Sequence, residues 1–121
     1  MISFRDTLAD IVHNVGGGLG AVIMGYDGIA IDEYSPQQDS CDMPLIAVEY
    51  ATLLKEVRRT VSVLKTGEME EMAIFTTKIG VIVRIINEEF FVLLAIDSTG
   101  NHGKGRFLLR RAVPLLQEEL Q

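Results

Sequence analysis

The sequence predicts an α/β (α+β) sandwich in which helices cover both faces of a five-stranded antiparallel sheet. Three segments repeat apolar residues at helical spacing, and five short apolar segments between turn residues have the length of strands. The segment FFVLLAI at 90–96 is apolar on both alternating faces, as a central strand covered on both sides must be. We therefore expect the order α-β-β-α-β-β-β-α in one domain spanning residues 1–121.

The N-terminal segments predict a helix and then a β-hairpin. Ser3 and Asp6 have the spacing of a capping box, and apolar residues follow at helical spacing until Gly16. The glycine-rich segment 16–20 should stop this helix and act as a flexible link. Two strands should then flank Asp27-Gly28, a dipeptide that favours a two-residue hairpin turn.

A polar loop at 35–43 should lead into a longer helix that runs to about Lys65. Asp42 can cap its first turn, Pro44 presets the backbone there, and Gly67 lies just beyond its end. On a helical wheel, seven apolar residues form a stripe about 100° wide that would face the sheet. They are Ile46, Tyr50, Leu53, Leu54, Val57, Val61 and Leu64.

The remaining residues predict three strands and a last helix. Short connections between the strand segments 72–77, 80–86 and 90–97 favour antiparallel pairing. In the last helix, Pro114 lies off the apolar face and should only bend the helix. The residues expected to face the core are Leu109, Ala112, Val113, Leu116 and Leu120, and those expected outside are Arg106, Arg110 and Gln117.

Charge and composition restrict the possible partners. The net charge of -6 argues against nucleic acid and against an anionic membrane surface, because both require clustered cations. The first residues lack the basic region of a signal peptide, and no apolar run reaches the roughly 18 residues that cross a bilayer. The single Cys41 excludes an internal disulfide. We therefore expect a cytoplasmic protein.

The segment DSTGNHGKGR at 97–106 has some features of a phosphate-binding loop. It lies between a predicted strand and a predicted helix, where backbone amides can converge on a phosphate. A Walker A loop, however, needs a glycine where this chain has Ser98 and a hydroxyl residue where it has Gly105. A nucleotide-binding enzyme that uses residues 98–105 is therefore kept only as an alternative.

No residues form a recognisable catalytic or metal-binding motif. His13 and His102 are isolated from one another and from any triad or metal-ligand spacing. Nothing near Cys41 in sequence would lower the pKa of its thiol. The adjacent carboxylates Glu70 and Glu71 are interpreted as a charged turn. We expect a non-enzymatic protein with no catalytic residues, no cofactor and no metal.

The second helix carries more apolar side chains than its core stripe. Val48 and Val63 lie far from the stripe, and Ala47 and Ala51 flank it. Each alone would be an ordinary surface residue. Together they indicate a second contact surface, where Ala47 and Ala51 would let a symmetry-related helix approach and form a homodimer. The predicted partner-binding residues mix apolar and charged groups, as interfaces do: Val48, Thr52, Lys55, Glu56, Arg59 and Val63.

With these features the chain resembles the roadblock/dynein light chain family, in particular its MglB-like bacterial members. The resemblance lies in GAVIMGYDGIAID, in the long helix after a polar loop, and in the stretch from MAIFTT through RFLLRRA to the end. It implies homodimerisation through the second helix and the neighbouring strand, and a small Ras-like GTPase as partner. MglB-like members stimulate GTP hydrolysis by reshaping the GTPase's own catalytic machinery, so no catalytic arginine is required of this chain.

Two functions remain open for such a protein. One is a regulator that binds a small Ras-like GTPase and acts as its GTPase-activating protein. The other is a dimeric scaffold or adaptor in a larger assembly, with no effect on GTP turnover. The process served, whether motility, cell polarity or another, stays open at this point.

Overall fold

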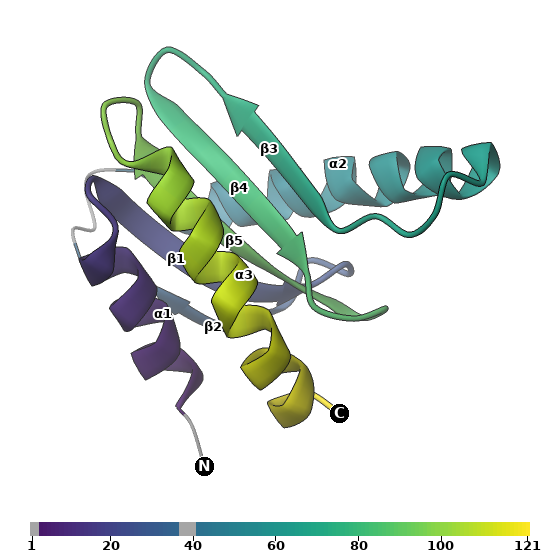
Figure 1. Ribbon diagram of the computed structural model, residues 1–121, viewed down its shortest axis with the longest axis horizontal. Coiled ribbons are helices and arrows are strands. Elements are labelled where there is room, and N and C mark those ends of the chain that lie inside the picture. The colour runs from purple at the N-terminus through teal and green to yellow at the C-terminus, as the bar shows by residue number, and fades with distance from the viewer. Residues whose placement is uncertain (1–2, 37–40) are drawn as a thin grey trace.

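The computed structural model describes residues 3–36 and 41–121. Its elements are α1 (Phe4–Asn14), β1 (Gly18–Gly25), β2 (Ala30–Tyr34), α2 (Met43–Leu64), β3 (Glu71–Phe75), β4 (Ile79–Ile85), β5 (Phe90–Asp97) and α3 (His102–Glu119) (Figure 1). The predicted order of helices and strands is confirmed. Residues 37–40 of the predicted polar loop lie outside the described residues.

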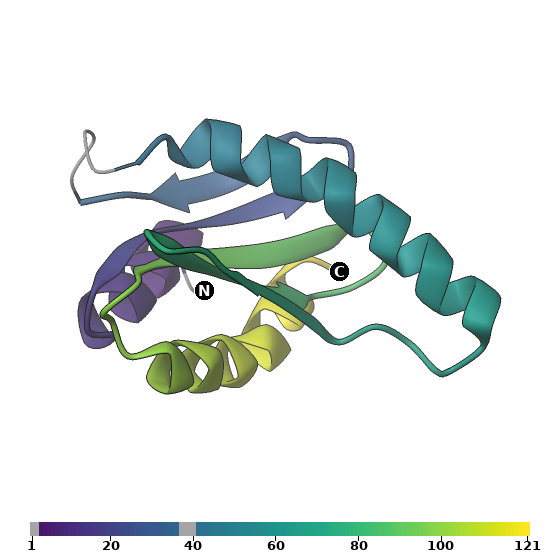
Figure 2. The same cartoon turned by 90° about the horizontal axis from the view of Figure 1, so that it is seen from above.

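The five strands form one antiparallel sheet in the order β2-β1-β5-β4-β3, so β5 is central, as predicted. α2 covers one face of the sheet, while α1 and α3 lie together on the other (Figure 2). Alternate residues of β5 supply the two cores. Phe91, Leu93 and Ala95 pack with α2, and Val92, Leu94 and Ile96 pack with α1 and α3.

α1 ends before the glycines, as expected, but the expectation of a flexible link over 16–20 is wrong, because Gly16 and Gly17 form a hydrogen-bonded turn and Gly18 and Gly20 belong to β1. β1 begins at Gly18, and its glycines let both helix layers come close to the strand. A Cβ on Gly18 would collide with the carbonyl of Val12 in α1, and a Cβ on Gly20 would lie 2.8 Å from Cγ of Met43 in α2. These glycines therefore determine how closely both helix layers pack.

The hairpin at Asp27-Gly28 is confirmed, but its loop is longer than two residues. The Gly25 amide donates to the Ile29 carbonyl at 3.0 Å, which encloses the three residues 26–28. Gly28 has φ +88°, the left-handed conformation that ends this kind of three-residue loop. The Asp27 carboxylate accepts from the Ile29 amide at 3.0 Å and stabilises the turn.

The ends of α2 have identifiable causes. Asp42 caps the first turn by accepting from the Leu45 amide at 3.2 Å, as expected. At the other end Lys65, rather than a glycine, adopts the left-handed conformation, with φ 56°. Its amide donates back to the carbonyls of Val61 and Ser62. Among the described residues, no helix is both long and apolar enough to cross a membrane.

Candidate partner-binding surfaces on helix α2

The side of α2 that faces the sheet differs from the predicted stripe. Its buried residues are Met43, Ala47, Ala51 and Leu54. This set is rotated by roughly 70° around the helix from the centre of the seven-residue stripe, at 3.6 residues per turn. Small side chains face the sheet because the helix lies close to it, as the contact of Met43 with Gly20 shows.

The placement of Ala47 and Ala51 is therefore a correction. Both belong to the core between α2 and the sheet and are almost completely inaccessible. They do not flank the core-facing side, and their methyl groups are not available to a second copy of the helix. Their small size serves the packing of α2 on its own sheet.

The apolar residues displaced by this rotation lie along one side of α2. We call this side the α2 flank, formed by Ile46, Leu53, Val57 and Leu64. Leu53 is 40% exposed and Leu64 is 63% exposed, whereas Ile46 and Val57 are half-buried. The C-terminal end of α2 extends beyond the sheet and has no strand beneath it (Figures 1 and 2). The chain's own sheet thus leaves part of an apolar helix uncovered.

The six predicted partner-binding residues form one continuous exposed surface. Val48, Thr52, Lys55, Glu56, Arg59 and Val63 are all exposed. They lie within about 100° of one another around the helix, on the side away from the sheet. We call them the α2 outer face. The guanidinium of Arg59 lies 3.4 Å from the Glu56 carboxylate in a solvent-exposed pair, and Thr52 donates to the Val48 carbonyl.

A cavity of about 640 Å³ lies beneath the projecting end of α2. Its walls come from α2, from the segment 67–70, from the β4–β5 turn and from α3. Arg58 contributes to the α2 wall, and its guanidinium also lies 4.1 Å from the ring centroid of Tyr26 at the end of β1. This cation–π contact fixes the C-terminal half of α2 to the sheet. Burial raises the pKa of the Tyr26 hydroxyl, which the charge of Arg58 partly opposes.

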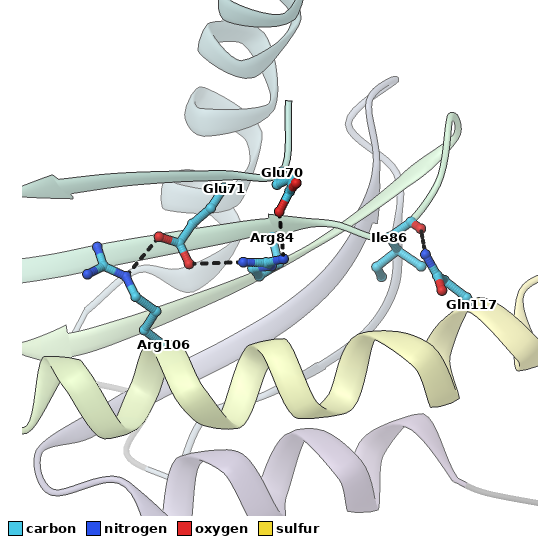
Figure 3. A network of polar contacts seen from close by, with 6 residues as sticks. All are labelled: Glu70, Glu71, Arg84, Ile86, Arg106 and Gln117. Carbon is cyan, nitrogen blue, oxygen red and sulfur yellow. Dashed lines mark hydrogen bonds and ion pairs between the residues drawn. The ribbon is translucent and has the colours of Figure 1, made fainter. Parts of the chain in front are cut away.

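An ionic network ties the edge strand β3 to its neighbours (Figure 3). Arg84 of β4 pairs with Glu71 at 3.4 Å and with Glu70 at 3.6 Å, and Glu71 also pairs with Arg106 of α3 at 2.8 Å. The interpretation of Glu70 and Glu71 as a charged turn is thus incomplete, and Arg106 is not simply outside. The network joins β3, β4 and α3.

Gln117 and Arg110 are also expected on the outside of α3, and the structure confirms this fully for Arg110 alone. Gln117 donates from Nε2 to the Ile86 carbonyl at 2.8 Å, so it too contacts the sheet (Figure 3). Arg110 is exposed, as expected. Long polar side chains at the border of a buried face can reach backbone groups that an apolar pattern does not reveal.

The glycine-rich segment 97–106 is built as a turn and not as a phosphate cradle. Its amides already donate within the chain: Ser98 to the Lys78 carbonyl, Thr99 to the Asp97 carboxylate, Gly100 to the Asp97 carbonyl, and Asn101 to the Gly16 carbonyl. The Asn101 side chain caps α3 by accepting from the Lys104 amide at 3.0 Å. Gly100 itself packs against the Gly16 carbonyl and Ile96, where a Cβ would collide.

The charge at this turn also disfavours a phosphate. Hydrogen bonds from the Thr99 amide and hydroxyl lower the pKa of the Asp97 carboxyl below its ordinary value. An ionised carboxylate at the entrance to the loop repels an anion. The nucleotide-binding alternative for residues 98–105 therefore has no support in the geometry.

The two histidines have structural contacts. His13 lies 2.6 Å from the Tyr34 hydroxyl, which connects α1 to β2. His102 is half-buried, lies 3.1 Å from the Asp97 carbonyl and packs against Phe75 in a tilted arrangement with ring centroids 4.8 Å apart. Within residues 3–36 and 41–121, no three His, Cys, Asp or Glu side chains are grouped so that they could hold a metal ion.

Comparisons with known proteins identify the fold and the family. MglC from Myxococcus xanthus is 35% identical over 98% of this chain and 99% of its own, with a TM-score of 0.71. The chain belongs to the roadblock/dynein light chain family. A Roadblock/LC7 domain from Streptomyces avermitilis has 12% identity and a TM-score of 0.85, with 98% of each chain covered. No protein-family model matches the sequence, and no curated protein does.

The MglB members of the family share the fold. MglB from Thermus thermophilus is 15% identical, with a TM-score of 0.82 over 98% of this chain and 92% of its own. This identity is well below the 35% found with MglC. The MglC and MglB structures thus support for this chain the fold of small-GTPase-associated regulators.

Proposed function

We propose that this roadblock protein is a homodimeric regulator or scaffold that binds a small Ras-like GTPase. The observation that carries the proposal is the excess of apolar surface on α2, since Leu53 and Leu64 of the α2 flank are exposed in a single chain. Because this fold is associated with small GTPases, we assign such a GTPase as the partner that binds the exposed surface of α2.

The α2 flank and the edge strand β3 are the surfaces that we assign to the homodimer. β3 ends the sheet order, so no strand of the described chain pairs with its outer edge. Unpaired edges attract a second strand, and β3 carries none of the lysines or prolines that would discourage it. A two-fold contact would place each flank against its symmetry copy. An MglB neighbour is known in a tetrameric arrangement, which is consistent with self-association within this fold.

The α2 outer face is the surface that we assign to the GTPase. It combines two exposed valines with Lys55, Glu56 and Arg59, the mixed character of a transient protein interface. It is separate from the core residues, so that a partner could bind it without disturbing the fold. A two-fold dimer would present this face twice.

The binding test is charge reversal on the outer face. Lys55→Glu with Arg59→Glu should abolish the binding of a Ras-like GTPase that is encoded beside this gene or co-purifies with the protein, measured by calorimetry. Arg110→Glu with Arg111→Glu makes the same change in charge on α3, across the sheet, and serves as the matched control. Equal affinity of the wild type and the α2 variant for the GTPase would contradict the assignment of GTPase binding to the outer face.

Activation and scaffolding differ in GTP turnover. The activator acts through the partner's catalytic machinery, so single-turnover hydrolysis by the GTP-loaded partner should accelerate when the roadblock protein is added. Binding without acceleration would favour the scaffold. The Thermus relative is named a gliding protein, and we propose gliding as a process that a regulator of this kind serves.

A further inference from the structure

Helix α3 is net positive in a chain whose net charge is -6. It has four Lys and Arg against Glu118 and Glu119 at its C-terminal end, a net charge of +2. The whole chain has 11 basic and 17 acidic residues, so the residues outside α3 have 7 and 15, a net charge of -8. Such segregation is the electrostatic pattern of a surface that meets an acidic partner.

Apolar side chains are interleaved with these charges on the outward side of α3. Phe107 is 56% exposed and Leu115 is 51% exposed. Together with Arg111 they follow one another at intervals of four residues along the helix. We call the surface formed by Lys104, Phe107, Arg110, Arg111, Pro114 and Leu115 the α3 stripe. Each of these residues is exposed.

The cations of the α3 stripe are not used within the fold. Among the described residues, Lys104, Arg110 and Arg111 form no ion pair, whereas Arg106 on the inner side of α3 pairs with Glu71. The Arg111 guanidinium lies 5.5 Å from the centroid of the Phe107 ring. Arginine and aromatic side chains are enriched at protein interfaces.

The stripe borders a small hollow between α1 and α3. It has a volume of about 150 Å³ and is lined by Thr7, Asp10 and Asn14 of α1 and by Arg111 and Leu115 of α3, among others. A hollow of that size can hold a group as large as a benzene ring. Arg111 and Leu115 of the stripe form one wall of this partly polar hollow, so an amphipathic helix that contacts Leu115 would lie against it.

We infer that the α3 stripe docks an acidic amphipathic helix of a different protein. The apolar residues of that helix would contact Phe107 and Leu115, and its carboxylates would pair with Arg110, Arg111 and Lys104. A flat anionic bilayer would have to cover α1 as well, which carries the exposed Asp6 and Asp10, whereas a single helix can lie along α3 alone. This surface lies across the sheet from α2 and is independent of the proposed GTPase site (Figure 2).

The direct test uses a synthetic helical peptide of 18 residues with leucines at i, i+3 and i+4 spacing and glutamates between them. A second peptide carries lysine in place of each glutamate. By fluorescence anisotropy the acidic peptide should bind the full-length wild-type protein, and more weakly as salt rises, whereas the basic peptide should not bind. Arg110→Glu with Arg111→Glu should weaken the affinity of the protein for the acidic peptide about tenfold or more.

Several controls make each outcome decisive. Phe107→Ser tests the apolar part and should also weaken binding, with folding verified by circular dichroism. Lys55→Glu with Arg59→Glu, the same change in charge on α2, should leave peptide binding unaltered, so a failure of the GTPase proposal does not affect this result. Equal binding of both peptides, no binding at millimolar peptide, or stronger binding to phosphatidylglycerol vesicles than to the peptide would overturn the inference.

Discussion

The neighbouring residues Leu53 and Leu54 should respond in opposite ways to truncation. Leu54 is fully buried between α2 and the sheet. Its replacement by alanine leaves a cavity and should cost about 2–5 kcal/mol of the free energy of unfolding. Leu53 lies on the α2 flank and is 40% exposed. Its replacement should affect the fold much less but should weaken the proposed dimer.

The size of the effect on the dimer follows from the exposed fractions. Full burial of a leucine side chain stabilises by about 1.5–3 kcal/mol. If the dimer covers the 40% of Leu53 and the 63% of Leu64 that a single chain exposes, each copy gains about 1.5–3 kcal/mol from the two residues together. Two-fold symmetry doubles this gain to about 3–6 kcal/mol, or roughly two to four orders of magnitude in the dissociation constant.

Sedimentation velocity over a range of concentrations measures this dissociation constant. The Leu53→Ala/Leu64→Ala variant should sediment as a monomer at concentrations where the wild type is a dimer. Thermal unfolding must be compared at one protein concentration, because a dimer's melting temperature depends on it. A dissociation constant within threefold of the wild-type value would refute the assignment of the flank to the dimer.

Two further predictions concern the charged groups. Arg84→Ala leaves the largely buried Glu71 with one partner and should lower the free energy of unfolding in urea by about 1–3 kcal/mol. Arg59→Ala breaks an exposed pair and should lower it by less than about 0.5 kcal/mol. Equal losses for the two variants would contradict the structural role of the network. Folding lowers the pKa of Asp97. At pH values above its ordinary pKa of 3.8 the ionised carboxylate therefore stabilises the folded protein, and this contribution is lost as the pH falls through the lower pKa of the folded state. Asp97→Asn should therefore flatten the dependence of unfolding free energy on pH below about 4, and an unchanged acid limb in pH-dependent unfolding would count against it.

The order of elements could be predicted from the sequence because local signals agree with the fold. Asp42 caps α2, Gly28 closes the first hairpin, and β5 is apolar on both faces. Each of these signals acts within a few residues of the chain. Local capping, turn chemistry and strand periodicity were therefore sufficient for the architecture.

The orientation of α2 could not be predicted in this way. A helical wheel shows only where the apolar residues cluster around the helix, and the cluster of large apolar residues predicts that Leu53 and Leu64 face the sheet. The distance between helix and sheet depends instead on Gly20, more than twenty residues earlier, which brings α2 so close that Ala47 and Ala51 occupy the contact. That long-range constraint turns part of the predicted core into the exposed α2 flank, and it buries Ala47 and Ala51, which the sequence predicts at a contact surface.

The two helix layers allow two partners to bind without competing. The α2 outer face and the α3 stripe lie on opposite sides of a five-stranded sheet (Figure 2). Substitutions at surfaces that share no contacts have additive effects. Charge reversal on either helix should therefore remove one partner and spare the other. A protein with a GTPase on α2 and an acidic helix on α3 would bring those two molecules into one complex, which is a regulatory role that requires no catalytic residue in this chain.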